Sequence, residues 1–160
     1  MSVIIAKVKT LLQKKNYNPI NDPNDDNILI LPGLSGKNGK FTLDLIGKDV
    51  STKNDAILLS QTEFPIKVPS NKREKILSFL NEINKDTSYS WLSLNMENGG
   101  IICRSCNRSK SDDSMNDDIL EPVLFSSLVI LDELQPFILD LIYSEKTVDM
   151  ILKEINQSTN

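Results

Sequence analysis

Hydrophobic and polar residues alternate along several short segments of this chain. In the segment 41–46, every second residue, beginning with Phe41, is large and apolar. A period of two is typical of a strand with one buried face. The first three strands are joined by short links, which favours an antiparallel meander. This pattern predicts strands at 28–31, 41–46, 56–61, 89–96 and 101–108.

Other segments repeat their apolar residues every three or four positions, which is the period of an amphipathic helix. Ile4, Val8 and Leu11 mark such a helix near the N-terminus, and Ser2 is placed to cap it. Pro136 lies inside the longest helical stretch and is expected to kink it or split it in two, because proline removes a helical hydrogen bond. The helices are predicted at 3–12, 70–84, 119–143 and, after a cap at Thr147, through Ile155.

Turn-forming residues separate these elements. Asn98-Gly99 is the strongest hairpin signal and predicts a type I′ turn, in which both residues need a positive φ. The segment 16–27 is rich in Asn, Asp and Pro and is expected to be a mobile loop. The element order is therefore α-β-β-β-α-β-β-α-α, an α+β protein with a single domain over 1–160 and a frayed tail at 157–160.

Charge and composition exclude several classes of function. The net charge is −4, so nucleic acid is not an expected partner, because phosphate binding needs clustered cations. The cluster Lys67, Lys72, Arg73 and Lys75 is interpreted as part of a solvated face of mixed charge. The chain has no histidine, which removes the commonest general base and most metal sites. We therefore expect a protein that is not an enzyme and has no metal or cofactor.

The location expected from the sequence is cytoplasmic. No apolar run approaches the ~20 residues of a membrane span, since the richest stretch, Ile119–Tyr143, is interrupted by acidic residues and Pro136. Lysines interrupt the N-terminal segment, so neither a secretory signal nor a membrane partner is expected.

Cys103 and Cys106 form the only C-x-x-C motif. Such a motif can be a redox pair or half of a zinc site. A redox pair normally lies at a helix N-terminus, whereas this one lies in a predicted strand. Residues three apart in a strand point to opposite faces, which forbids a disulfide without bending the backbone. We interpret the two cysteines as reduced thiols.

Three further groups of residues suggest chemistry only weakly. Two acidic segments, 22–26 and 112–118, lack the spacing of a calcium loop and are interpreted as solvated loops. The glycines of 33–39 precede a strand and are interpreted as turn residues, not a phosphate-binding loop. The aromatic residues around the predicted helix and hairpin belong either to the core or to a face that receives a partner; they are Phe64, Phe79, Tyr89 and Trp91.

The segment 64–155 resembles the YbjN family, and the strands before it agree with that family in order. The residues that carry the resemblance are Val68-Pro69, the helical segment 79–84, the hairpin from Gly99-Gly100 to Arg104, and Tyr143 followed by a helix capped at Thr147. The chain departs from the family at Asp149-Met150, where a Glu-Ala pair is frequent. The resemblance implies one twisted antiparallel sheet with helices packed on it, similar to the class I type III secretion chaperones.

The same resemblance implies a non-catalytic bacterial protein that binds a partner polypeptide, chaperone-like or regulatory, and is often a homodimer. By analogy with the chaperones, the dimer contact is expected at 70–84 and 89–96, with Phe79 and Trp91 as anchors and Ile83 and Tyr89 beside them. The alternative is an immunity or antitoxin-type protein whose acidic loops neutralise a basic partner.

Overall fold

The part of the chain that the structure describes forms one sheet and four α-helices. The computed structural model describes residues 1–50, 55–110 and 117–158. The predicted order of elements is confirmed, with a short additional strand and a 3₁₀ turn. The elements are α1 (Val3–Lys14), β1 (Ile20–Asn21), β2 (Ile28–Ser35), β3 (Lys40–Val50), β4 (Asp55–Glu63), η1 (Ser70–Lys72), α2 (Arg73–Lys85), β5 (Ser90–Leu94), β6 (Ile101–Lys110), α3 (Asp117–Tyr143) and α4 (Val148–Ser158).

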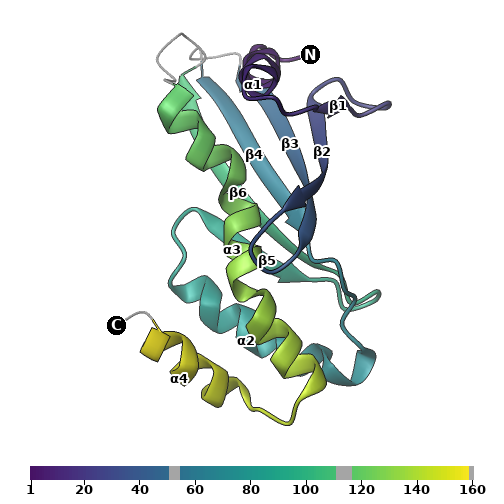
Figure 1. Ribbon diagram of the computed structural model, residues 1–160, viewed down its shortest axis with the longest axis vertical. Coiled ribbons are helices and arrows are strands. Elements are labelled where there is room, and N and C mark those ends of the chain that lie inside the picture. Colours follow the sequence, from purple (N-terminus) through teal and green to yellow (C-terminus); the bar gives the residue numbers. More distant parts are fainter. Residues whose placement is uncertain (51–54, 111–116, 159–160) are drawn as a thin grey trace.

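The strands form a single antiparallel sheet in the order β1-β2-β3-β4-β6-β5 (Figure 1). Strands β1 to β4 come from the first part of the chain, whereas β5 and β6 follow α2. The two groups join where β4 pairs with β6, from Asp55 opposite Lys110 to Glu63 opposite Ile102. The predicted α+β class, with a sheet built from both parts of the chain, is therefore confirmed.

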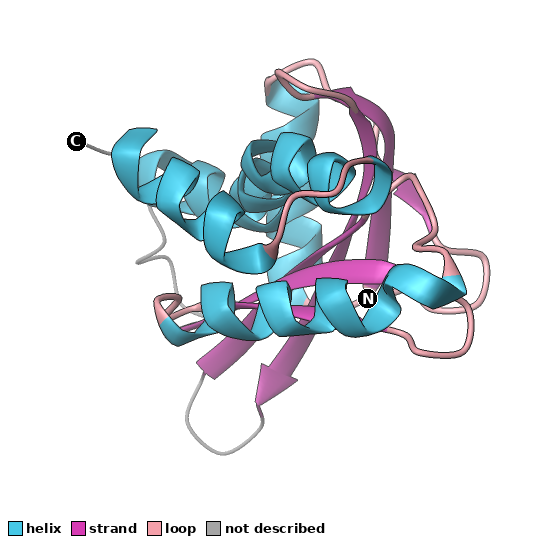
Figure 2. Cartoon of the chain, turned by 90° about the horizontal axis from the view of Figure 1, so that it is seen from below, coloured by secondary structure: helices cyan, strands magenta, loops and turns pink. Residues whose placement is uncertain are grey.

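The helices cover one face of this sheet, called here the inner face. In β3 the inner residues Phe41, Leu43 and Leu45 are buried. One apolar cluster lies between α1 and strands β2 to β4, and a larger one joins α2, α3 and α4 to β5 and β6. Figure 1 shows α3 crossing the sheet along its length. Figure 2 shows the twist of the strands and the C-terminal helix outside, where it packs on α2 and α3.

Hydroxyl groups lie between the two apolar clusters. The buried Thr62 Oγ1 and Ser127 Oγ atoms are 2.9 Å apart. Next to them, Ser60 Oγ and Ser126 Oγ are 3.4 Å apart. These small side chains let α3 approach β4 closely, and their hydroxyls satisfy one another. Apolar periodicity alone does not predict this contact.

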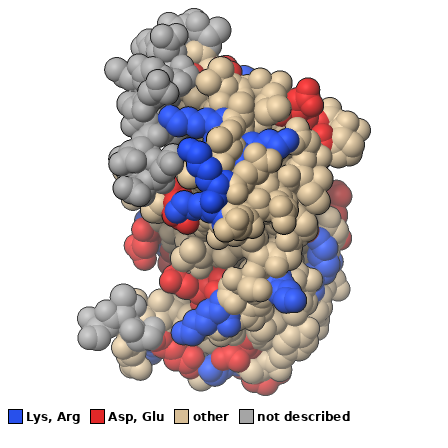
Figure 3. Space-filling model, turned by 45° about the horizontal axis from the view of Figure 1, so that its top comes forward, with Lys and Arg blue, Asp and Glu red and all other residues tan. Residues whose placement is uncertain are grey.

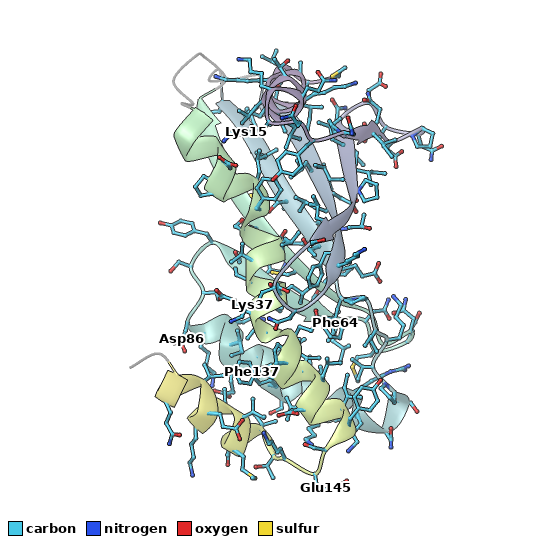
Figure 4. The ribbon with its side chains drawn as sticks, in the orientation of Figure 1. Lys15, Lys37, Phe64, Asp86, Phe137 and Glu145 are labelled. Carbon is cyan, nitrogen blue, oxygen red and sulfur yellow. The ribbon has the colours of Figure 1, made fainter. Side chains whose placement is uncertain are left out.

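The hairpin between β2 and β3 is fastened to α3 by Asp132. Figure 4 shows Lys37, near the tip of this hairpin, against the middle of α3. The buried Asp132 carboxylate accepts the backbone N–H of Lys37 at 2.7 Å and of Asn38 at 2.8 Å. A Cβ atom on Gly36 would lie only 2.5 Å from this carboxylate, so the close approach requires glycine.

Of the two outcomes predicted at Pro136, a kink or a split of the helix, the split does not occur in α3. This helix is continuous from Asp117 to Tyr143. Proline has no backbone N–H, so the carbonyl of Asp132, four residues earlier, loses its helical partner. The Asn38 side-chain amide donates to this carbonyl at 2.9 Å. A tertiary hydrogen bond thus replaces the helical one.

The β5–β6 hairpin is confirmed, but the predicted type I′ turn is wrong. Residues 95–100 form a longer connection, in which Gly99 has a φ of +74° and Asn98 does not have a positive φ. The Asn95 side chain organises this loop by accepting the N–H groups of Glu97 at 2.8 Å and Asn98 at 3.2 Å. A Cβ atom on Gly99 would lie 2.2 Å from the Val68 carbonyl oxygen, so this position requires glycine.

Three boundaries also differ from the predictions. Ser2 precedes α1 but makes no side-chain cap; the Val3 N–H donates instead to Asp49 Oδ2 at 2.8 Å. The predicted loop at 16–27 contains β1, which pairs with β2. Helix α4 continues to Ser158, so part of the tail expected to fray is helical, and residues 159–160 lie outside the described chain.

The segment Glu121–Tyr143 of α3 is long and apolar enough to cross a membrane by length and composition. This finding corrects the expectation that no stretch approaches that length. The same segment forms the middle of the core here, since Leu131, Ile138 and Leu141 have no exposed surface.

Candidate functional site: the open face of the sheet

The face of the sheet opposite the helices, called here the open face, is unusually apolar. In β4 the residues alternate between fully buried inner positions and half-buried outer ones. An antiparallel sheet with one solvated face ordinarily carries polar residues there. Here the outer positions include seven large apolar residues: Ile28, Ile30, Ile46, Ile57, Leu59, Trp91 and Ile102.

One row of the open face crosses four strands without a charged residue. The register places Ile28 opposite Ile46, Ile46 opposite Leu59, and Leu59 opposite Cys106. Directly opposed side chains on one face are close enough to pack on one another. All four side chains are half-buried, so this row is a continuous apolar strip that no helix of the described chain covers.

The next row is polar at its centre. Asp44 in β3 is opposite Gln61 in β4, and Gln61 is opposite Arg104 in β6. The Arg104 Nε atom donates to Gln61 Oε1 at 2.7 Å, and the Gln61 side chain hydrogen-bonds Asp44. Partial burial is the main cause that raises the pKa of Asp44 above its usual range, and the nearby Asp22 and Glu63 raise it further. Ile30 and Trp91 flank this row at its two ends.

Two of the charges at the margins of the open face, Glu63 and Arg108, are paired within the chain. Glu63 forms an ion pair with Lys67. Arg108 Nη2 lies 2.6 Å from Asp55 Oδ2. Figure 3, which brings the top of the molecule forward, shows basic side chains near α1 and both signs of charge over the lower half.

The residues predicted to form the interface lie in different environments. Phe79 has no exposed surface and packs inside the larger apolar cluster, so the prediction that it is a surface anchor is corrected. Ile83 is half-buried beside the same cluster. Trp91 is 40% exposed on the open face, and Tyr89, immediately before β5, is 76% exposed. The structure therefore leaves Tyr89 and Trp91 as exposed candidates and does not bring them together with Phe79.

The edge of the sheet at β5 is already occupied. The Asn84 side chain of α2 donates to the Leu92 carbonyl at 2.9 Å and accepts the Leu92 N–H at 2.8 Å. These are the backbone groups that an added strand would use. The sequence-based expectation of a contact through 89–96 therefore does not extend to strand addition at Leu92.

Cys103 and Cys106 are free thiols on opposite faces of β6, as predicted. Cys103 is completely buried on the inner face, and this burial raises the pKa of its thiol to about 12. Cys106 is half-buried on the open face. The thiolate is the nucleophilic form, so the two side chains differ in reactivity by burial and by ionisation.

At a protein concentration low enough for the chain to be a monomer, alkylation with iodoacetamide at pH 8 is therefore expected to modify Cys106 and spare Cys103 in the folded protein. Both thiols should react in denaturant, where Cys103 regains its ordinary pKa. Peptide mass spectrometry after timed quenching separates the two sites. Equal rates at the two cysteines in the native protein would show that Cys103 is not protected as described.

The remaining candidate groups have local structural partners. Asp22 Oδ1 accepts the backbone N–H groups of Asn24 and Asp25, which orders the first acidic loop. Of the second acidic segment, residues 112–116 lie outside the described chain. Within the described residues, no group of three or more Cys, Asp or Glu side chains could hold a metal ion.

The predicted basic cluster likewise serves the fold. Arg73 donates to the carbonyls of Met96 at 2.7 Å and Glu97 at 3.0 Å, which fastens the β5–β6 loop to the start of α2. Lys75 Nζ donates to the carbonyl of Leu141 at 3.2 Å, near the end of α3.

No protein-family model matches the chain, and a search of curated proteins finds no match. Among solved structures, the chain is similar to the crystal structure of YbjN from E. coli. The sequence identity is 12% and the TM-score is 0.45, over 82% of this chain and 92% of that one. The likeness concerns the fold alone.

Proposed function

We propose that this protein is a non-catalytic protein-binding module, chaperone-like or regulatory, that acts as a homodimer in the bacterial cytoplasm. The observation that carries this proposal is the open face, where seven large apolar side chains lie on the side of the sheet that faces away from the helices of the described chain. Contiguous exposed apolar patches on soluble proteins commonly mark interaction sites.

The chemistry of the open face supports binding more than catalysis. Its polar centre, Asp44–Gln61–Arg104, is a chain of hydrogen bonds in which each group already has a neighbour. Its thiol, Cys106, lies in an apolar row. Trp91 and Tyr89 supply exposed aromatic surface of the kind that dominates many protein interfaces.

Static light scattering on the wild-type protein tests the homodimer. At tens of micromolar, the expected mass is twice the chain mass of 18.0 kDa. A protein that stays at the single-chain mass throughout this concentration range would contradict the homodimer.

A pull-down from the native host, analysed by mass spectrometry, tests the partner polypeptide. The expected result is one enriched protein in addition to further copies of the chain itself. Recovery of the chain alone would contradict the chaperone-like or regulatory part of the proposal.

A further inference from the structure

We infer that two copies of this chain associate through their open faces, related by a two-fold axis that runs along β4. This inference rests on the proposed homodimer and identifies the surface and the register through which it forms. It differs from the contact expected by analogy with the secretion chaperones, which would use α2 and the edge strand β5.

The charges of the polar row are complementary under this symmetry. Gln61 lies on the central strand, with Asp44 on the β3 side and Arg104 on the β6 side. A two-fold axis along β4 exchanges these two sides. Asp44 of each copy is then opposite Arg104 of the other, so one face forms two reciprocal ion pairs, as an isologous interface requires.

The environment of Asp44 within one chain agrees with this arrangement. Arg104 Nε donates to Gln61 Oε1 and not to Asp44. Asp44 is half-buried, with Asp22 and Glu63 as its charged neighbours, and its pKa is raised. Arg104 of the second copy would supply the compensating cation. It would approach from the one side of Asp44 that the sheet leaves open.

The apolar residues are complementary in the same register. The axis places Leu59 opposite Leu59 of the second copy and Ile46 opposite Cys106, while Ile30 meets Trp91 at both ends of the polar row. Sheets that stack face to face keep their strands roughly aligned and interdigitate such side chains. The same axis places Glu63 opposite Glu63 and Lys48 opposite Arg108 of the second copy; within their own chain Glu63 is paired with Lys67 and Arg108 with Asp55.

The size of the open face suits a stable contact. Five neighbouring strands at about 4.8 Å spacing cover roughly 24 Å, and strands of this length extend roughly 30 Å. The product is roughly 700 Å² for each copy, close to the about 800 Å² that one partner buries in a standard interface. A dimer formed by pairing of edge strands at β5 does not compete with this contact. The Asn84 side chain already hydrogen-bonds the N–H and the carbonyl of Leu92.

Charge reversal tests this register directly. Asp44→Arg alone places Arg opposite Arg in the homodimer, and Arg104→Asp alone places Asp opposite Asp. Each variant is expected to dimerise more weakly by on the order of tenfold or more, because like charges are then apposed at the interface. The double variant Asp44→Arg/Arg104→Asp should recover the dimer. Sedimentation velocity over a concentration series measures all three.

Mixing the two single variants distinguishes a contact between copies from an effect within one chain. In the mixed dimer, the arginine introduced by Asp44→Arg in one copy lies opposite the aspartate introduced by Arg104→Asp in the other. The unchanged Arg104 of the first copy lies opposite the unchanged Asp44 of the second. Two proteins that dimerise weakly alone should therefore form a heterodimer when combined.

Glu133→Arg, on the exposed side of α3, is the matched control for these charge reversals. It makes the same change of charge as Asp44→Arg, away from the open face, and should dimerise like the wild type. Circular dichroism melts verify that every variant is folded.

Three results would overturn the inference, and they differ in what they imply for the homodimer. A wild-type monomer would remove both the homodimer and this interface. A wild-type dimer that both single reversals leave unchanged, or single variants that fail to combine on mixing, would retain the homodimer and place its contact elsewhere.

Discussion

Replacing Phe79 by alanine is expected to lower the free energy of unfolding by about 3–5 kcal/mol, the usual loss for a buried phenylalanine. The Phe79 side chain has no exposed surface. It lies in a cluster that includes the inner residues Leu92 and Cys103 and the α3 residue Ile138. Truncation of this side chain would leave a cavity where α2, β5 and α3 pack together. Urea denaturation monitored by circular dichroism measures the loss.

Trp91→Ala is the matched aromatic control for Phe79. Trp91 is 40% exposed on the open face, so its loss should change the monomer stability by only about 1 kcal/mol or less, as for surface positions in general. The same substitution should weaken dimerisation. The opposite pattern, in which Phe79→Ala leaves stability intact and abolishes the dimer, would restore Phe79 as an interface anchor and contradict the packing described.

Replacing Asp132 by alanine is expected to cost about 3 kcal/mol, since hydrogen bonds to a charged group contribute about 1.5–3 kcal/mol each. Asp132 is only 7% exposed and accepts two backbone N–H groups from the β2–β3 hairpin. Its loss would leave the N–H groups of Lys37 and Asn38 without this acceptor. Thermal unfolding measures the stability, and hydrogen exchange at these two amides should accelerate specifically.

Glu133→Ala is the neighbouring control, because Glu133 is exposed on α3. It should change the free energy of unfolding by no more than about 0.5 kcal/mol. Equal effects of the two substitutions would show that the hydrogen bonds to Asp132 do not hold the hairpin. Unchanged hydrogen exchange at Lys37 and Asn38 in Asp132→Ala would show the same.

The open face illustrates how far the sequence pattern can be used. Alternation predicts the inner series Phe41, Leu43 and Leu45. The outer series of the same strand is Thr42, Asp44 and Ile46. It is harder to predict as an apolar face, because two of these three residues are polar. Only the strand register brings Ile46 beside residues of β2 and β4, which have no fixed sequence relation to it.

The incorrect predictions have tertiary causes. Pro136 does not split its helix because Asn38, almost a hundred positions earlier, donates to the carbonyl that the proline leaves free. Asn98 does not adopt the I′ turn because the Asn95 side chain organises a longer loop. Phe79 lies beside the apolar stripe of its helix, yet it is buried because both α3 and α4 pack on α2.

The single tryptophan provides the most direct test that the open face is where two copies meet. Trp91 is the only tryptophan of the chain and lies on that face. Its fluorescence can be followed on dilution from tens of micromolar to nanomolar, alongside the molecular mass. The predicted result is a red shift and greater acrylamide quenching as the mass falls to that of one chain. A fall in mass with unchanged Trp91 emission and quenching would contradict an interface formed by the open face.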